Sequence, residues 1–145
     1  MDQSYVGRSF PFAEAYEVGR ESIRKFAEAI GDDNTLYYNK VAAQHAGHPD
    51  VVAPPTFMIA VVARAQDAVL FDPALGLDFS RVVHLDQRFV HHRVAVAGDV
   101  LRSVVQVESI KVLAGNDVIT MRTEVNAENG PVCTSFGTVV SRGAP

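Results

Sequence analysis

Two side chains in one short polar segment could handle protons, because Asp32 and Tyr37 both lie in the run Gly31-Asp32-Asp33-Asn34-Thr35-Leu36-Tyr37. A carboxyl group can act as a general acid or base, and a phenol can donate a hydrogen bond to an oxygen that becomes negative. An ordinary tyrosine titrates near pH 10, so it is a poor base at neutral pH. Asp32 can also be read as a turn residue, and Tyr37 as a packed aromatic residue with its hydroxyl at the surface. The pair predicts acid chemistry that lacks an evident base.

Histidine would be the usual base, and three histidines lie in the strand-like half of the chain. His84 alternates with apolar residues and could reach a cleft, although a histidine in a strand is more often structural. His91 and His92 are adjacent, so they point to opposite faces of a strand and cannot act together. We therefore keep His84 as a candidate functional group.

A metal site is a weaker interpretation of the pattern His45-x-x-His48-x-Asp50. The two histidines would share a helical face only if the helix continued past Gly47, and zinc sites usually need three or four well-placed ligands. We expect no metal and no other cofactor. Cys133 is the one cysteine, so no intrachain disulfide can form, and we expect it to be a small buried residue.

The first half of the chain predicts three helices. Apolar residues repeat with helical spacing over residues 21–30, and Gly31 supplies a stop. A short helix is expected over 40–46, with Asn39 as its N-cap. After a double proline, residues 56–71 are mostly apolar and predict a buried helix.

The second half predicts strands, because apolar residues alternate with polar ones from Val83 to Val140. Turn signals interrupt this pattern at Gly98-Asp99, Gly115–Asp117 and Asn126–Gly130, so we expect an antiparallel meander. Residues 16–18 could add one more strand. We predict one α+β domain over residues 1–145, in which a curved antiparallel sheet wraps a central buried helix, the hot-dog fold.

The polar segment resembles the hydratase/dehydratase signature of the MaoC-like family, Gly-Asp-x-Asn-Pro-(aliphatic)-His. Thr35 replaces the proline of that signature, and Tyr37 stands where the family has its catalytic histidine. The resemblance extends to Val52–Phe57, Asp86–Val90 and Ala97–Asp99, which are similar to the actinobacterial HadA/HadC-type subunits of (3R)-hydroxyacyl-ACP dehydratase.

This resemblance implies a subunit of a (3R)-hydroxyacyl-thioester dehydratase, or enoyl hydratase, that acts on a thioester of CoA or acyl carrier protein. A HadB-type partner would carry the Asp/His pair, while this chain would shape the acyl-chain channel. Asp32 is the equivalent of the catalytic acid. The glycine that precedes the family's buried helix aligns with Pro55, which has no N–H to donate to an oxyanion, so the N–H of Thr56 is the substitute. The residues expected at the substrate are Asn34, Pro54, Pro55, Thr56 and Phe57.

Two alternatives stay open at this point. The chain could be a self-sufficient homodimeric hydratase that uses Asp32 with Tyr37 or His84, or an acyl-thioester binding module without turnover. Its net charge of −4 and pI near 5.7 argue against a nucleic-acid partner. The apolar segment 57–70 is too short and too charged to span a membrane, and we see no signal peptide, so we expect a cytoplasmic protein that assembles at least as a dimer.

Overall fold

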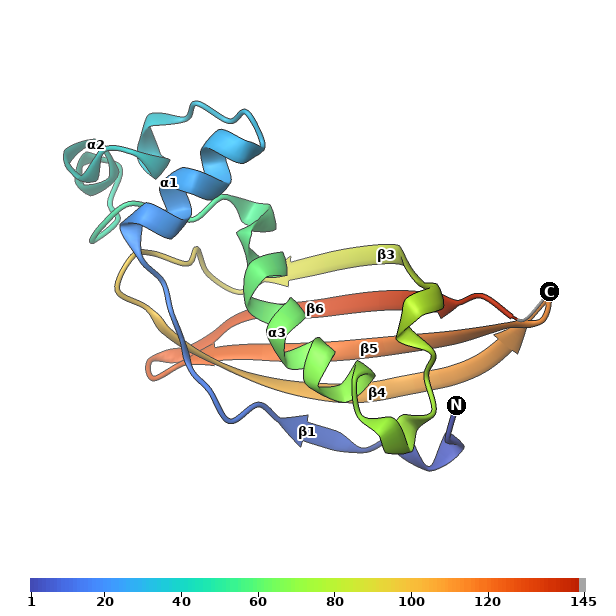
Figure 1. The fold of residues 1–145 in the computed structure, drawn as a ribbon. Helices are drawn as coiled ribbons and strands as arrows, with labels where there is room; N and C mark the ends of the chain where they lie inside the picture. Colours follow the sequence, from blue (N-terminus) through green and yellow to red (C-terminus); the bar gives the residue numbers. More distant parts are fainter. Residues whose placement is uncertain (144–145) are drawn as a thin grey trace.

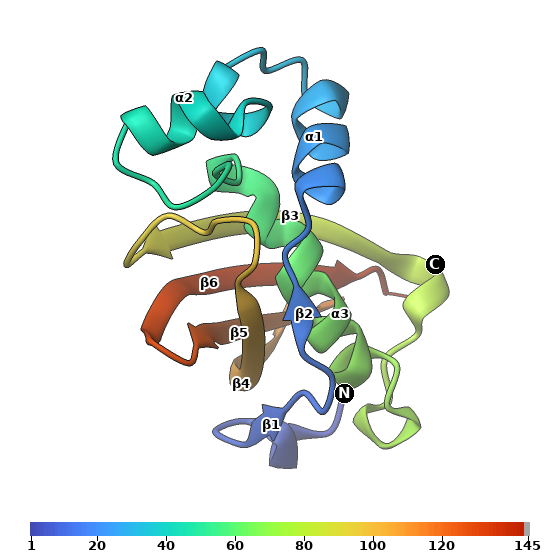
Figure 2. The ribbon, with the colours of Figure 1, turned by 90° about the vertical axis from the view of Figure 1, so that its left-hand side faces the viewer.

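The computed structural model describes residues 1–143 and shows an antiparallel sheet of six strands that curls around one long helix (Figures 1 and 2). Along the sheet the order is β1-β4-β5-β6-β3, and β2 also pairs with β4. The strands are β1 (Ser9–Pro11), β2 (Tyr16–Glu17), β3 (Val82–His91), β4 (Val100–Leu113), β5 (Asn116–Ala127) and β6 (Gly130–Ser141). The helices are α1 (Arg20–Ala29), α2 (Lys40–His45) and α3 (Met58–Leu70).

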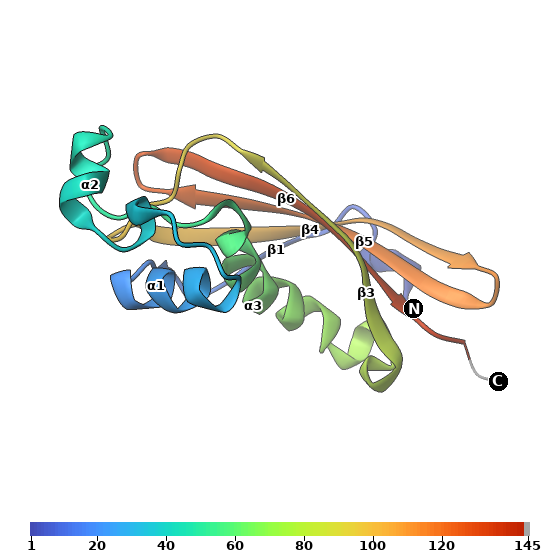
Figure 3. The same ribbon diagram turned by 90° about the horizontal axis from the view of Figure 1, so that it is seen from above.

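The helices begin and end where the sequence predicts. Gly31 follows α1 in the left-handed conformation, with φ of 70°. The side chain of Asn39 caps α2 by accepting a hydrogen bond from the backbone N–H of Ala42. A 3-10 turn over Pro55–Phe57 leads directly into α3. In Figures 1 and 3, α1 and α2 lie side by side near the end of the sheet where α3 begins.

The second half forms the predicted meander. The tight turn between β4 and β5 places Ala114 and Gly115 at φ of 49° and 79°, the two left-handed residues that a type I′ hairpin turn needs. Residues 16–18 do contribute a strand, β2, which pairs with β4. The α+β hot-dog fold predicted from the sequence is confirmed.

The core lies between α3 and the inner face of the sheet. Val62 and Val69 of α3 are buried, whereas Arg64 on the opposite side of the helix is exposed and pairs with Glu14. The single chain therefore covers one face of α3 and leaves the other open. Within residues 1–143, no helix is long and apolar enough to cross a membrane.

Strand β3 forms one edge of the sheet, since it pairs with β6 alone in the strand order. A bulge between His84 and Asp86 shifts its register, so the strict alternation predicted for this strand breaks at Leu85. Val83 and Leu85 are both exposed. An edge strand of ten residues with exposed apolar side chains is a surface that can pair with another chain.

Candidate functional site

The polar loop after α1 is shaped by its own side chains. The half-buried Asp32 accepts a hydrogen bond from the backbone N–H of Asn34, at 3.1 Å. Asn34 in turn accepts one from the N–H of Leu36, at 3.1 Å, and the hydroxyl of Tyr38 donates to the backbone oxygen of Asp32, at 2.7 Å. Asp32 and Asn34 therefore hold the loop in shape, whatever else they do.

Tyr37 is the predicted partner of Asp32, and the structure brings the two together. Its side chain is buried in the core, and burial, together with the nearby carboxylate of Asp32, raises the pKa of the Tyr37 hydroxyl. A phenol whose pKa lies above its ordinary value stays protonated at neutral pH. The pair can hold and donate protons, but Tyr37 does not supply the base that the histidine of the signature would provide.

A short ladder of backbone hydrogen bonds connects this loop to the start of α3. The N–H of Val52 donates to the oxygen of Leu36, at 3.0 Å, and the N–H of Ala53 donates to the oxygen of Ala95, at 2.8 Å. Val52 also forms an isolated bridge with Val96. The polar loop, the segment before α3 and the segment after β3 are thus fixed side by side.

An apolar cavity of about 230 Å³ lies where these segments meet, and we call it the proline cavity. Its one titratable side chain is that of His91, at the end of β3. The lining residues are Ala53, Pro54, Pro55, Met58, His91, Val94 and Ala95. Two of the residues predicted to border the substrate, Pro54 and Pro55, do lie at this cavity.

Thr56 and Phe57, which are also expected at the substrate, differ in exposure. Thr56 is exposed, and its N–H belongs to the first turn leading into α3, where backbone donors lack helical acceptors. Phe57 is only 1% exposed and packs edge-on against Tyr16 and Phe26, with ring centroids 6.0 and 5.5 Å away. In the single chain Phe57 is therefore a core residue that holds the start of α3.

The histidine at the cavity is not the one that the sequence favours. His84 lies seven residues before His91 on β3, about 23 Å away for an extended strand, and its Nε2 is 3.0 Å from the backbone oxygen of Asp86. His92 faces the other side, where its Nε2 lies 2.9 Å from the hydroxyl of Thr134. The predicted opposite orientation of His91 and His92 is correct. His91 lies two residues after the apolar Phe89, which packs against the core. This spacing is the sequence signal that could have placed His91 on the inner face of β3.

Cys133 is buried, as expected, and lies opposite His91 in the pairing of β3 with β6. Burial raises the pKa of its thiol to about 11, so it remains a neutral thiol. It contributes apolar surface behind the cavity rather than a nucleophile.

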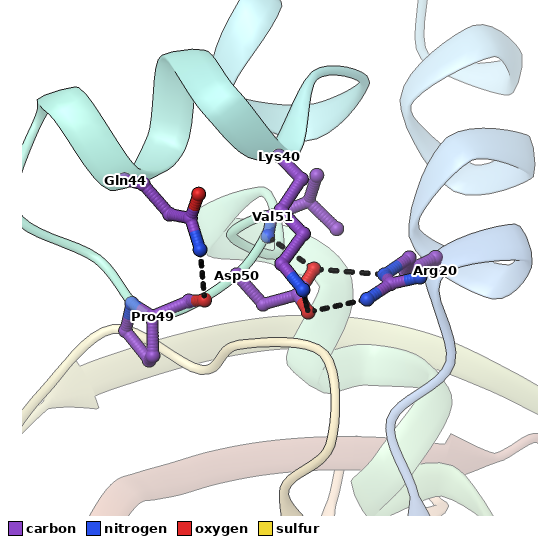
Figure 4. Close-up of polar contacts among 6 residues, drawn as sticks. All are labelled: Arg20, Lys40, Gln44, Pro49, Asp50 and Val51. Atoms are coloured by element: carbon purple, nitrogen blue, oxygen red, sulfur yellow. Dashed lines mark hydrogen bonds and ion pairs between the residues drawn. The ribbon is translucent and has the colours of Figure 1, made fainter.

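Asp50 belongs to an ion-pair cluster that ties α1 and α2 to the segment before α3 (Figure 4). Arg20 donates two hydrogen bonds to its carboxylate, at 2.9 and 2.8 Å, and the Nζ of Lys40 lies 3.6 Å away. The carboxylate also accepts a hydrogen bond from the N–H of Val51, at 2.8 Å. The hydrogen bonds from Arg20, followed by that from Val51, lower the pKa of Asp50 to about 2. Asp50 is thus engaged in a structural cluster.

Replacing Asp50 with asparagine is expected to lower Tm by about 2–4 °C at pH 7, because the pair is partly exposed and such pairs contribute little. The pKa of Asp50 is lower in the folded chain than in the unfolded chain. Its contribution is therefore complete above the ordinary pKa near 3.8 and is lost as the pH falls towards 2. Thermal unfolding of both proteins between pH 7 and pH 2 checks this, and a gap that stays constant down to pH 2 would contradict it. Asp33→Asn, in an exposed loop position, is the matched control.

Comparison with known proteins places these features in a family. Residues 4–135 match the dehydratase domain region of the FAS1-like type. A relative from Saccharopolyspora erythraea, named UPF0336 protein, is 55% identical over 144 residues, which cover 99% of this chain and 92% of that protein. The C-terminally truncated HadBC (3R-hydroxyacyl-ACP dehydratase) complex from Mycobacterium tuberculosis superposes with a TM-score of 0.85 at 28% identity, covering 97% of this chain and 98% of that one. A MaoC-like dehydratase superposes with a TM-score of 0.88 at 32% identity, covering 97% of this chain and 43% of that chain.

The curved antiparallel sheet around one helix matches the hot-dog fold of the MaoC-like dehydratases. The chain belongs to the family of FAS1-like dehydratase domains. The predicted similarity to the Had-type dehydratase subunits is confirmed.

Proposed function

We propose that this chain is one subunit of a cytoplasmic (3R)-hydroxyacyl-thioester dehydratase, or enoyl hydratase in the reverse direction, and that a HadB-type partner supplies the missing base. The observation behind the proposal is a buried Tyr37, near Asp32, at the position where the family signature has a histidine.

Dehydration of a β-hydroxyacyl thioester breaks the Cα–H and Cβ–O bonds and forms a carbon–carbon double bond and water. A base removes the α-proton, the carbon–carbon double bond forms, and the β-hydroxyl takes a proton from an acid and leaves as water. Negative charge develops on the thioester oxygen and needs N–H or O–H donors. In this chain's own loop, Asp32 offers an acid and Tyr37 offers a hydrogen-bond donor. Pro55 at the cavity has no N–H, so the loop and the cavity together lack both a base and one oxyanion donor.

The open edge of the sheet supports assembly with a second chain. Strand β3 leaves a row of backbone groups and the apolar side chains of Val83 and Leu85 exposed. The solved HadBC protein, to which this chain is similar over nearly its full length, is described as a complex. A homodimer would repeat the same incomplete loop twice, so a heterodimer is the assembly that completes the chemistry.

The proline cavity supports a role in binding the acyl thioester. It is apolar except for His91, it lies at the start of α3, and the ladder from Leu36 to Ala95 connects it to the polar loop. Its volume of about 230 Å³ lies just below the usual range for a ligand pocket, which fits a site that a second chain enlarges. CoA and acyl carrier protein remain equal candidates for the thioester carrier.

Co-expression tests the proposal. The chain is purified alone and with a partner that carries the complete Gly-Asp-x-Asn-Pro-x-His motif, and hydration of crotonyl-CoA is followed. We expect turnover only from the complex, and its loss when the partner's motif histidine is replaced by alanine. Asp32→Asn in this chain is expected to change the rate less than threefold, because the partner's own motif supplies both the acid and the base. Turnover by the chain alone that disappears with Asp32→Asn would identify a homodimeric hydratase instead. Binding of crotonyl-CoA without turnover in any pairing would identify a binding module.

A further inference from the structure

A layer of polar side chains divides the interior between α3 and the sheet into two apolar halves. Gln66 is 7% exposed, and its Nε2 donates to the hydroxyl of Thr123, at 3.1 Å. On the neighbouring strands, the Nε2 of Gln87 donates to the hydroxyl of Ser135, at 2.6 Å. Thr123 and Ser135 are both fully buried and lie opposite each other in the pairing of β5 with β6. We call Gln66, Gln87, Thr123 and Ser135 the polar layer.

The polar layer coincides with the boundary between two hydrophobic clusters. Along β5 it separates Val125, which belongs to the cluster around Phe57, from Met121, which belongs to the other cluster. Along α3 it separates Val62 from Val69 in the same way. A buried polar layer costs free energy unless all its groups are paired, so its presence across the whole helix–sheet contact calls for a reason.

One group in the layer is not paired. The Oε1 atom of Gln87 is buried and receives no hydrogen bond from residues 1–143. Gly137 provides the space for the two amides, since a Cβ atom there would lie 3.0 Å from Gln87 Oε1 and 3.3 Å from Gln66 Nε2. The amide groups of Gln66 and Gln87 therefore both lie over Gly137, and a larger residue at this position would contact them too closely.

The layer lies in line with the proline cavity. Met58 and His91 both line the cavity, and α3 and β3 run inward from there to the two glutamines. The eight residues from Met58 to Gln66 advance about 12 Å along a helix. The four residues from His91 to Gln87 advance about 13 Å along a strand. The two estimates agree, so the polar layer lies about 12 Å beyond the cavity along the helix–sheet contact.

We propose that the polar layer is the closed end of the acyl-binding path and limits the length of the acyl chain; this rests on the proposed function. An extended chain covers about 1.2 Å per bond, so about ten carbons fit between the cavity and the layer. Val62 of α3 and the half-buried Phe89 of β3 lie midway along this stretch, and the side chain of Met58 at its start adapts easily to a bound chain. A longer chain would place methylene groups against Gln66 and against the unpaired oxygen of Gln87, and neither amide could then recover hydrogen bonds with water.

Binding of saturated acyl-CoAs to the complex of this chain with its partner tests the inference without requiring turnover. Hexanoyl-, decanoyl- and hexadecanoyl-CoA are titrated by calorimetry below their micelle-forming concentrations. We expect affinity to rise from hexanoyl to decanoyl and to fall at least tenfold from decanoyl to hexadecanoyl. Gln66→Leu removes the buried amide at nearly constant volume and is expected to abolish that fall. Gln44→Leu, on the exposed surface of α2, is the matched control and should leave the profile unchanged.

The outcomes separate the two proposals. If none of the three acyl-CoAs binds, the proposed function fails. If all bind and affinity rises steadily up to hexadecanoyl-CoA in the unmodified complex, the length limit is wrong while the function stands. The length limit is equally wrong if folded Gln66→Leu keeps the tenfold fall. Should Gln66→Leu fail to fold, the profile of the unmodified complex still decides.

Discussion

Replacing Phe57 with alanine is expected to lower the free energy of unfolding by about 3–5 kcal/mol, the usual cost of removing a fully buried aromatic ring. Phe57 is 1% exposed, and its ring packs in a T-shaped arrangement against Tyr16 from β2 and against Phe26 from α1. Aromatic pairs of this geometry add to the effect of burial alone. Since domains of this size are stable by only about 5–15 kcal/mol, much of the stability would be lost. Urea unfolding followed by circular dichroism at 25 °C measures the difference.

The matched control is Phe71→Ala at the other end of α3. Phe71 is 55% exposed and stacks on Phe79, with ring centroids 3.9 Å apart. Its removal is expected to cost less than about 1 kcal/mol, because little area is withdrawn from water there. If both variants lose the same small amount of unfolding free energy, Phe57 is not a core residue in solution. That result would favour its predicted place at the substrate.

The fold could be predicted from the sequence because local signals agree with one another. Gly31 ends α1, Asn39 caps α2, and Gly115 makes the tight turn between β4 and β5. Periods of 3.6 and 2 then assign helices and strands, and only one architecture packs a single long helix on an antiparallel meander. The irregularities of the sheet are the exception, since they depend on strand pairing and leave no local signal in the residue types. They lie between His84 and Asp86, between Val107 and Ser109, and between Val125 and Asn126.

The site was less predictable because it depends on contacts between distant segments. Asp32 and Tyr37 could be found from the motif, but the motif does not say that Phe57 is enclosed by two aromatic rings. His91 could be placed only by fixing which face of β3 turns inward, and the bulge disrupts the alternation near His84. The polar layer shows the same limit, because Gln66 of α3 and Gln87 of β3 come together only where both reach over Gly137 of β6.

Restoring the two altered positions is expected to create a working site in this chain. Tyr37→His returns the base of the signature next to Asp32, and Pro55→Gly returns a backbone N–H at the proline cavity. General acid–base catalysis by one placed group contributes about 10²–10⁴-fold, and one oxyanion donor about 10²–10³-fold. We therefore expect the double variant to hydrate crotonyl-CoA at least 10²-fold faster than the parent chain. The measurement is made in complex with a partner whose own motif histidine is alanine, so that the rate reports on this chain alone.

Each single variant should recover only part of the rate, because the base and the oxyanion donor act in the same transition state. Tyr37→His alone restores the base but still lacks an N–H at residue 55 for the oxyanion. Pro55→Gly alone restores that N–H but leaves a protonated phenol where a base is needed. Adding Asp32→Asn to the double variant removes the acid and should return the rate to that of the parent chain. Gln44→His, which places a new imidazole on the exposed surface of α2, controls for histidine as such. A folded double variant that stays at the parent rate would show that the polar loop does not face the proline cavity in the assembled complex. The equivalence of Asp32 to the family's catalytic acid would then be wrong.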